Sequence, residues 1–96
     1  MTEKPTKYRS QIRIYVDMLL AIEKEMGNAR PTHVLYGANL SHDRLVKYLA
    51  HLKETGLIEE IGASDKVTYS LTDKGIEFLK EFRKIRQFTE AFGFVI

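Results

Sequence analysis

Apolar residues recur at three- and four-residue spacing through the first part of the chain, with charged residues between them. From about residue 9 to residue 26 this spacing predicts an amphipathic helix. Its apolar residues are Ile12, Tyr15, Val16, Leu19, Leu20 and Ile22. Gly27 and Asn28 are expected to end the helix, because both residue types tolerate the left-handed backbone that closes helices. Pro31 suits the first turn of a short second helix, which ends at Gly37.

A third helix is predicted over residues 41–55. Ser41 is a strong N-cap, because its hydroxyl can accept hydrogen bonds from the free amides of the first turn. Gly56 stands where a glycine commonly closes a helix. One face of this helix is an apolar stripe of Leu45, Tyr48, Leu49 and Leu52. The other face is polar and carries His42, Asp43, Arg44, Lys47 and His51.

Two apolar segments, residues 57–61 and 67–71, flank a small polar turn of residues 62–66, which is typical of a β-hairpin. Thr72 is then expected to cap a last helix over residues 73–91. Two helices joined by a turn of about four residues match the helix-turn-helix pattern, and a hairpin directly after them makes it a winged helix. We therefore expect a mainly α fold with a small β-hairpin wing, in the order α-α-α-β-β-α.

This fold fits one domain of residues 9–92, preceded by a basic arm of residues 1–8 and followed by an apolar tail of residues 93–96. The chain has 96 residues, of which 44% are hydrophobic and 29% are charged, so it can build a single packed core. A chain of this length gains stability when it also buries surface against a partner.

The residues needed for several kinds of chemistry are absent. The sequence has no cysteine, which excludes disulfides, thiolate nucleophiles and Cys-based zinc sites. His33, His42 and His51 are nine residues apart, so no two of them share a helical face as a metal pair. No stretch approaches the roughly 18 apolar residues of a membrane helix, and the basic N-terminus is not a signal peptide. We expect a non-enzymatic cytoplasmic protein, in the nucleoid or in a host cell if viral, without metal, cofactor, membrane or small-molecule substrate.

The charge is unevenly distributed, although the net charge is only +2. Residues 1–56 carry nine basic and six acidic residues, residues 57–71 carry one and three, and residues 72–96 carry five and four. The positive excess coincides with the predicted helix-turn-helix, which favours an approach to a polyanion such as DNA.

Two stretches carry a family resemblance that extends over roughly residues 8–90. The first is Leu40-Ser41, Leu45, Tyr48-Leu49, Leu52 and Gly56-Leu57-Ile58, and the second is Tyr69-Ser70-Leu71-Thr72-Asp73-Lys74-Gly75. Together they resemble the small archaeal winged-helix DNA-binding proteins, which include dimeric chromosomal proteins and transcription regulators, some of them viral. The resemblance implies sequence-directed or architectural DNA binding by a homodimer formed through the terminal helices. The chromosomal members have a long C-terminal coiled-coil helix, whereas this sequence ends soon after Phe92, so we expect a more compact dimer.

The polar face of residues 41–55 is the leading candidate for base recognition, because a helix fits the major groove and its first turn points at base edges. Arg44 and Lys47 are the strongest candidates for guanine or phosphate, and Asp43 weakens the basic character. The predicted DNA contacts are Lys7, Arg9, Thr32, His33, Ser41, His42, Arg44, Lys47, His51, Ser64 and Lys66.

Some of these residues have a structural alternative. Thr32 and His33 either touch phosphate or only cap the second helix. The basic arm, which includes Lys7 and Arg9, either follows a phosphate strand or is an untethered terminus. The hairpin is acidic overall, so we expect a shallow contact, mainly by Lys66, unless the tip is only a connecting turn. Tyr48 is expected to pack in the core.

The last helix is unusually aromatic, and a small monomer cannot easily bury all of its apolar residues. Ile76 and Leu79 can face the domain's own core, which leaves a second apolar seam. The predicted dimer interface is Phe78, Phe82, Ile85, Phe88 and Phe92. A dimer would place two reading helices about 34 Å apart and so predicts a palindromic site. The alternative is that this helix packs back onto the first one.

We therefore expect a homodimeric, sequence-specific regulator of transcription that binds double-stranded DNA. Two alternatives stay open. One is an architectural or chromatin protein of the same fold that binds DNA without sequence preference, which the mild net charge disfavours. The other is a module that binds a protein partner and whose basic helix face is merely solvated.

Overall fold

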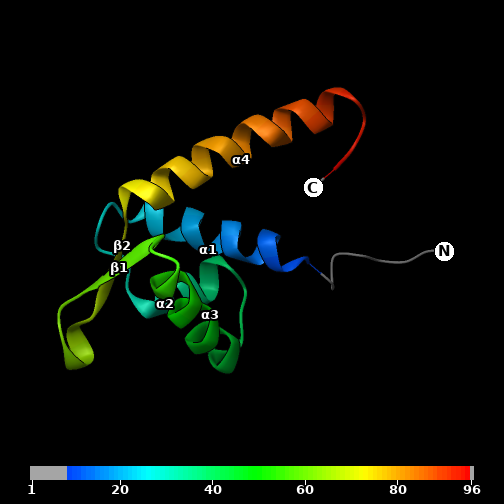
Figure 1. Cartoon of the computed structure of the whole chain (residues 1–96). Coiled ribbons are helices and arrows are strands. Elements are labelled where there is room, and N and C mark those ends of the chain that lie inside the picture. Colours follow the sequence, from blue (N-terminus) through cyan, green and yellow to red (C-terminus); the bar gives the residue numbers. More distant parts are fainter. Residues whose placement is uncertain (1–8, 96) are drawn as a thin grey trace.

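The structure is a computed structural model that describes residues 9–95. Its helices are α1 (Gln11–Lys24), α2 (Pro31–Gly37), α3 (His42–Glu54) and α4 (Asp73–Ala91), and its strands are β1 (Ile58–Ile61) and β2 (Thr68–Leu71) (Figure 1). A 3-10 turn, η2 (Ser64–Lys66), lies between the strands. This order confirms the predicted α-α-α-β-β-α fold. Lys7, with the rest of residues 1–8, and the side chain of Ser64 lie outside what the structure describes.

Hydroxyl side chains cap three of the helices. The Ser41 hydroxyl accepts a hydrogen bond of 3.3 Å from the Arg44 amide, and the Thr72 hydroxyl accepts one of 3.1 Å from the Gly75 amide. Both caps confirm the sequence prediction. Ser10 caps α1 in the same way, so this helix begins two residues later than the apolar spacing alone predicted.

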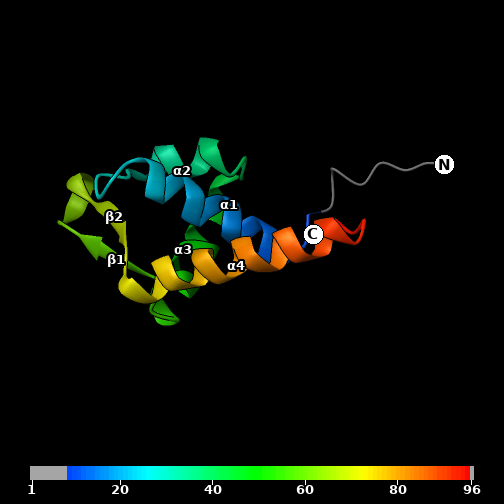
Figure 2. The same cartoon turned by 90° about the horizontal axis from the view of Figure 1, so that it is seen from above.

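The core is centred on α1, which lies between α4 above and α2 and α3 below in Figure 1, and between α2 and α4 in Figure 2. Because α1 contacts α2, α4 and β2, more than one of its faces is buried. Ile14 and Met18 are buried although the predicted stripe omitted them, whereas Ile12 belonged to that stripe and is 47% exposed. An apolar stripe identifies only one buried face, so it underestimates a central helix.

The hairpin makes a backbone contact outside its own two strands. β1 and β2 are antiparallel, and Ile58 pairs with Leu71 at the base of the hairpin. In addition, the Tyr69 amide donates a hydrogen bond of 2.7 Å to the carbonyl oxygen of buried Ala29, in the connection between α1 and α2. This bridge joins the wing to the connection between the first two helices. A pairing of one residue leaves no alternating pattern, so the sequence could not predict it.

The two connections around α2 differ in detail from the prediction. Met26 and Gly27 have the left-handed backbone after α1, rather than Gly27 and Asn28, and Asn39 has it after α2. Gly37 ends α2 as predicted, but its role is steric. A Cβ atom at this position would lie 2.8 Å from the Cβ of Ala21, so only glycine lets α2 approach α1 this closely.

The residues that α4 buries differ from those expected. Leu79 and Phe82 are buried in the monomer, with Phe82 only 6% exposed, and Phe78 packs against the same core. The assignment of Phe82 to a dimer interface is therefore wrong for the fold as it stands, because its ring fills the space between α4 and the core. Ile76, which was expected to face the core, is 51% exposed.

Candidate nucleic-acid interface

α3 and the tip of the hairpin lie on the side of the molecule away from α4, whereas the base of the hairpin adjoins the start of α4 (Figure 1). α3 buries Leu45, Leu49 and Leu52 against the core, which orients its polar side chains outward. Successive helix residues are about 100° apart, so Asp43, Lys47 and Ala50 lie on the side opposite the leucines. The result is a capped helix whose polar surface is accessible beside a projecting hairpin.

Arg44 and Lys47 are both exposed on this surface, three residues apart. Among residues 9–95 neither side chain takes part in an ion pair, so both are accessible to an external anion. Lys47 Nζ lies 5.9 Å from the centre of the Tyr48 ring. Asp43 occupies the first turn of α3, where a negative charge stabilises the amino end of a helix. Ser41 and His42 are exposed at the same end.

His51 lies toward α1 rather than on the centre of the outward surface. Its ring stacks on Tyr15 of α1, with ring centres 5.4 Å apart and planes at 24°. Tyr15 also meets Tyr48 edge to face at 5.3 Å. Tyr48 therefore packs between α3 and α1, as expected, and His51 belongs to the same aromatic cluster at the margin of the candidate interface.

The hairpin carries both signs of charge near its tip. Glu59, Asp65 and Lys66 are exposed, so the described wing offers Lys66 beside acidic side chains. Glu60 forms an ion pair within the chain, because Lys53 Nζ of α3 lies 2.6 Å from its carboxylate. This hydrogen bond raises the pKa of Lys53, and it connects the end of α3 to the first strand of the wing.

Arg9 is held inside the fold and is not part of a free arm. Its guanidinium lies 2.7 Å from the Asp17 carboxylate of α1 and donates hydrogen bonds to the carbonyl oxygens of Ala38 and Asn39. Ala38 and Asn39 form the turn that precedes α3. The expected phosphate contact is therefore wrong for Arg9 in this conformation, because its donors are already directed at these three acceptors.

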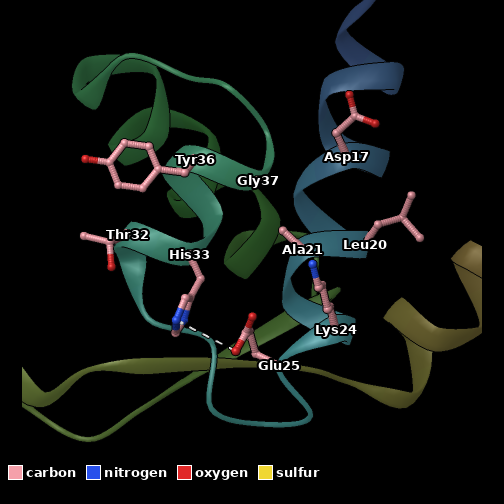
Figure 3. A pocket seen from close by; sticks show the side chains of 9 residues that line it. All are labelled: Asp17, Leu20, Ala21, Lys24, Glu25, Thr32, His33, Tyr36 and Gly37. Carbon is pink, nitrogen blue, oxygen red and sulfur yellow. Dashed lines mark ion pairs between the residues drawn. The ribbon is translucent and has the colours of Figure 1, made fainter.

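His33 caps α2, one of the two alternatives left open by the sequence. Its Nδ1 accepts a hydrogen bond of 2.9 Å from the Arg30 amide, and its Nε2 lies 3.8 Å from Glu25 (Figure 3). Thr32 beside it is exposed. Both residues line an open pocket of about 570 Å³ between α1 and α2, whose charged residues are Asp17, Lys24 and Glu25. The mixed charges of this pocket favour no particular ligand.

The comparison with family models gives a match to the winged helix-turn-helix over residues 8–90. The chain belongs to the winged helix-turn-helix family. This assignment confirms the resemblance stated above, and the hairpin β1–β2 is the wing of the fold.

Solved structures of other winged-helix proteins are similar to this one. Sso10a-2, a DNA-binding protein from the archaeon Sulfolobus solfataricus, is 29% identical over 86% of this chain and 87% of that chain, with a TM-score of 0.68. MepR from Staphylococcus aureus is 15% identical over 91% of this chain and 64% of that chain, with a TM-score of 0.69. A MarR family transcriptional regulator from Silicibacter pomeroyi is 16% identical over 91% and 67%, with a TM-score of 0.64. A search of curated protein sequences finds no match.

Three residues of this winged helix belong to the interface region but were not singled out in the sequence. Lys53 forms the ion pair with the wing, and a contact between residues seven apart on different elements has no sequence signal. Val46 and Ala50 are apolar yet exposed on α3. Their position outside the leucine stripe follows from the helical spacing. The sequence alone gives no sign that two apolar residues on a polar helix face have a function.

Within residues 9–95, no group of three or more His, Asp or Glu side chains could hold a metal ion. None of the helices in this part of the chain is long and apolar enough to cross a membrane.

Proposed function

We propose that this protein is a sequence-specific regulator of transcription that binds double-stranded DNA as a homodimer. The observation that carries the proposal is α3, a capped helix of a winged helix-turn-helix whose outward side presents Arg44 and Lys47, neither of which forms an ion pair among the described residues. The description of Sso10a-2 as DNA-binding supports the DNA-binding part.

In this proposal α3 enters the major groove. Arg44 donates to guanine or to phosphate, and Lys47 acts as a point charge for either. The exposed Ser41 and His42 at the amino end of α3 lie where free backbone amides favour phosphate oxygen. His51 contributes at most at the edge of the groove, because its ring is stacked on Tyr15.

The other predicted contacts have supporting roles in the proposal. Lys66 touches a neighbouring phosphate from the wing, and Thr32 touches the backbone from the first turn of α2. Lys7 and Ser64 keep their proposed roles as backbone contacts. Arg9 is left out, since it stabilises the turn before α3, and His33 is assigned to the helix cap.

The homodimer is proposed from the second half of α4, which diverges from α1 (Figure 1). Ile85 is 53% exposed, and Phe88 and Phe92 are 65% and 66% exposed, with ring centres 5.1 Å apart. Phe94 and Val95, which follow the end of α4, are 66% and 91% exposed. An exposed apolar strip of this kind is unusual in a monomer and indicates an interface. Phe78 contributes only through its partly exposed ring.

The proposal is tested by selecting bound duplexes from a random DNA pool and then footprinting the protein on the selected duplex. A specific dimer selects one palindromic sequence and protects it alone, with binding that weakens steeply as salt rises. Uniform protection of all DNA would instead favour the architectural alternative. The absence of any mobility shift, even at low salt, would contradict DNA binding and favour a protein partner.

A further inference from the structure

Two apolar side chains interrupt the polar surface of α3. Val46 is 55% exposed and Ala50 is also exposed, although α3 already has a complete buried stripe of leucines. The two residues are four apart, which places their Cβ atoms about 5–6 Å from each other on one side of the helix. They form a small apolar pair between Lys47 and the wing-side Lys53.

Nothing within the described chain accounts for this pair. Val46 is not part of the core, and neither residue is among the side chains packed against it. Valine is also a poorer helix former than the lysine or glutamate that such an exposed position would accept. The pair is too small for a protein docking patch, which covers a few hundred Å², and the apolar strip of α4 is on the far side of the molecule (Figure 1).

We propose that Val46 and Ala50 recognise thymine by contacting its 5-methyl group in the major groove. This inference rests on the proposed function. The thymine methyl is the apolar group that the base pairs display in that groove. A valine pressed against the donor or acceptor of another base would leave that group unpaired and desolvated, which is unfavourable. The pair therefore favours thymine at the positions it covers.

The spacing of the pair restricts where the thymines lie. Base pairs are stacked 3.4 Å apart along one strand. A separation of about 5–6 Å between Cβ atoms therefore matches thymines one or two steps apart. The preferred half-site should contain these thymines opposite the middle of α3, beside the positions contacted by Arg44 and Lys47.

The test replaces thymines of the selected duplex, one at a time, by deoxyuridine. Uracil keeps the base pairing and lacks only the methyl group, so the wild-type protein itself can be measured. We expect one or two positions at which the affinity falls about fourfold, the factor for burying one methyl group. Val46→Ala should show no uracil penalty at one of these positions. The matched control is Ile76→Ala, which removes a similarly exposed aliphatic group from α4 and should keep every penalty.

Two results would overturn the inference while leaving the proposed function intact. One is a selected sequence that contains no thymine in the half-site. The other is a wild-type affinity that is unchanged by uracil at every position. A protein that selects no sequence at all would instead remove the proposed function, and this inference with it.

Discussion

Arg9 is a single side chain that helps to fix the position of α3, the candidate reading helix. It connects Asp17 on α1 with the carbonyl oxygens of Ala38 and Asn39, directly before the cap of α3. Its side chain and that of Asp17 are only 25% and 19% exposed, so this ion pair is less screened by water than a surface pair. The position of α3 is therefore fixed partly by a residue outside the helix-turn-helix.

Replacing Arg9 by methionine should lower the free energy of unfolding by about 1–2 kcal/mol, because hydrogen bonds from a charged group are lost and carbonyl oxygens are left unpaired. Urea denaturation measures this. The control is Arg86→Met, which breaks a surface pair with Glu90 and should change stability by less than about 1 kcal/mol. An Arg9→Met protein of unchanged stability but weakened DNA affinity would restore the phosphate contact predicted from the sequence.

Gly37 gives a second prediction at this scale. An alanine in a helix is normally about 1 kcal/mol better than glycine, but here its Cβ would lie 2.8 Å from that of Ala21. We expect Gly37→Ala to destabilise the protein by about 1–3 kcal/mol through overpacking. The double variant Ala21→Gly with Gly37→Ala should recover part of the loss in the same denaturation measurement. Stabilisation by the single variant would show that α1 and α2 can separate without cost.

At the scale of elements, the caps made most of the fold predictable. Ser41 and Thr72 mark the starts of α3 and α4 through local hydrogen bonds, and the polar turn between two apolar segments marks the wing. These signals are local, so the sequence displays them. The basic, outward side of α3 was predictable for the same reason, since its leucine stripe fixes which residues remain outside.

The contacts between elements were not predictable. The bridge from Tyr69 to Ala29, the burial of Phe82 and the internal binding of Arg9 all depend on how elements pack, which periodicity does not record. Phe82 and Phe88 are similar in sequence terms, yet one is buried and the other is 65% exposed. The difference arises because α4 diverges from α1 beyond its middle.

The ion pair between Lys53 and Glu60 should orient the wing relative to α3. Lys53→Met should increase amide hydrogen exchange in β1 and β2 severalfold, and Lys53→Arg should restore protection. Because the pKa of Lys53 is raised in the folded protein, the contribution is fully present below the unfolded value of 10.5 and is lost as pH rises through the higher folded pKa. Wing exchange that is equal in wild type and Lys53→Met at neutral pH would contradict this role.

At the scale of the whole molecule, α4 gives the fold its elongated shape of 45 × 29 × 21 Å. Its first half covers the core, and Arg83, just past the middle of α4, forms an ion pair of 2.8 Å with Glu23 of α1. Its second half exposes Ile85 and Phe88 to solvent, and Phe92 follows directly after the helix. The proposed DNA-reading helix α3 and the second half of α4, proposed for self-association, thus lie on opposite sides of one small domain (Figure 1).

The proposed dimer makes a direct prediction. The wild-type protein should sediment at twice the chain mass of 11.1 kDa. Replacing Phe88 and Phe92 together by serine should yield a folded monomer, because both rings are more than half exposed in the single chain and contribute little to its core. Serine at Ile76, on the first half of α4, serves as the control and should leave the dimer intact. A wild-type protein that is monomeric at high concentration would contradict the proposal.

The central claim is that α3 reads DNA, and the affinity of Arg44→Ala for the selected duplex tests it most directly. Lys80→Ala on α4 removes the same charge from the far side of the molecule and is the matched control (Figure 1). We predict that Arg44→Ala loses about 1–3 kcal/mol of binding free energy on the selected duplex and much less on a scrambled one. Lys80→Ala should bind the selected duplex nearly as wild type does. Equal affinity of wild type and Arg44→Ala for the selected duplex would contradict the assignment of α3 as the reading helix.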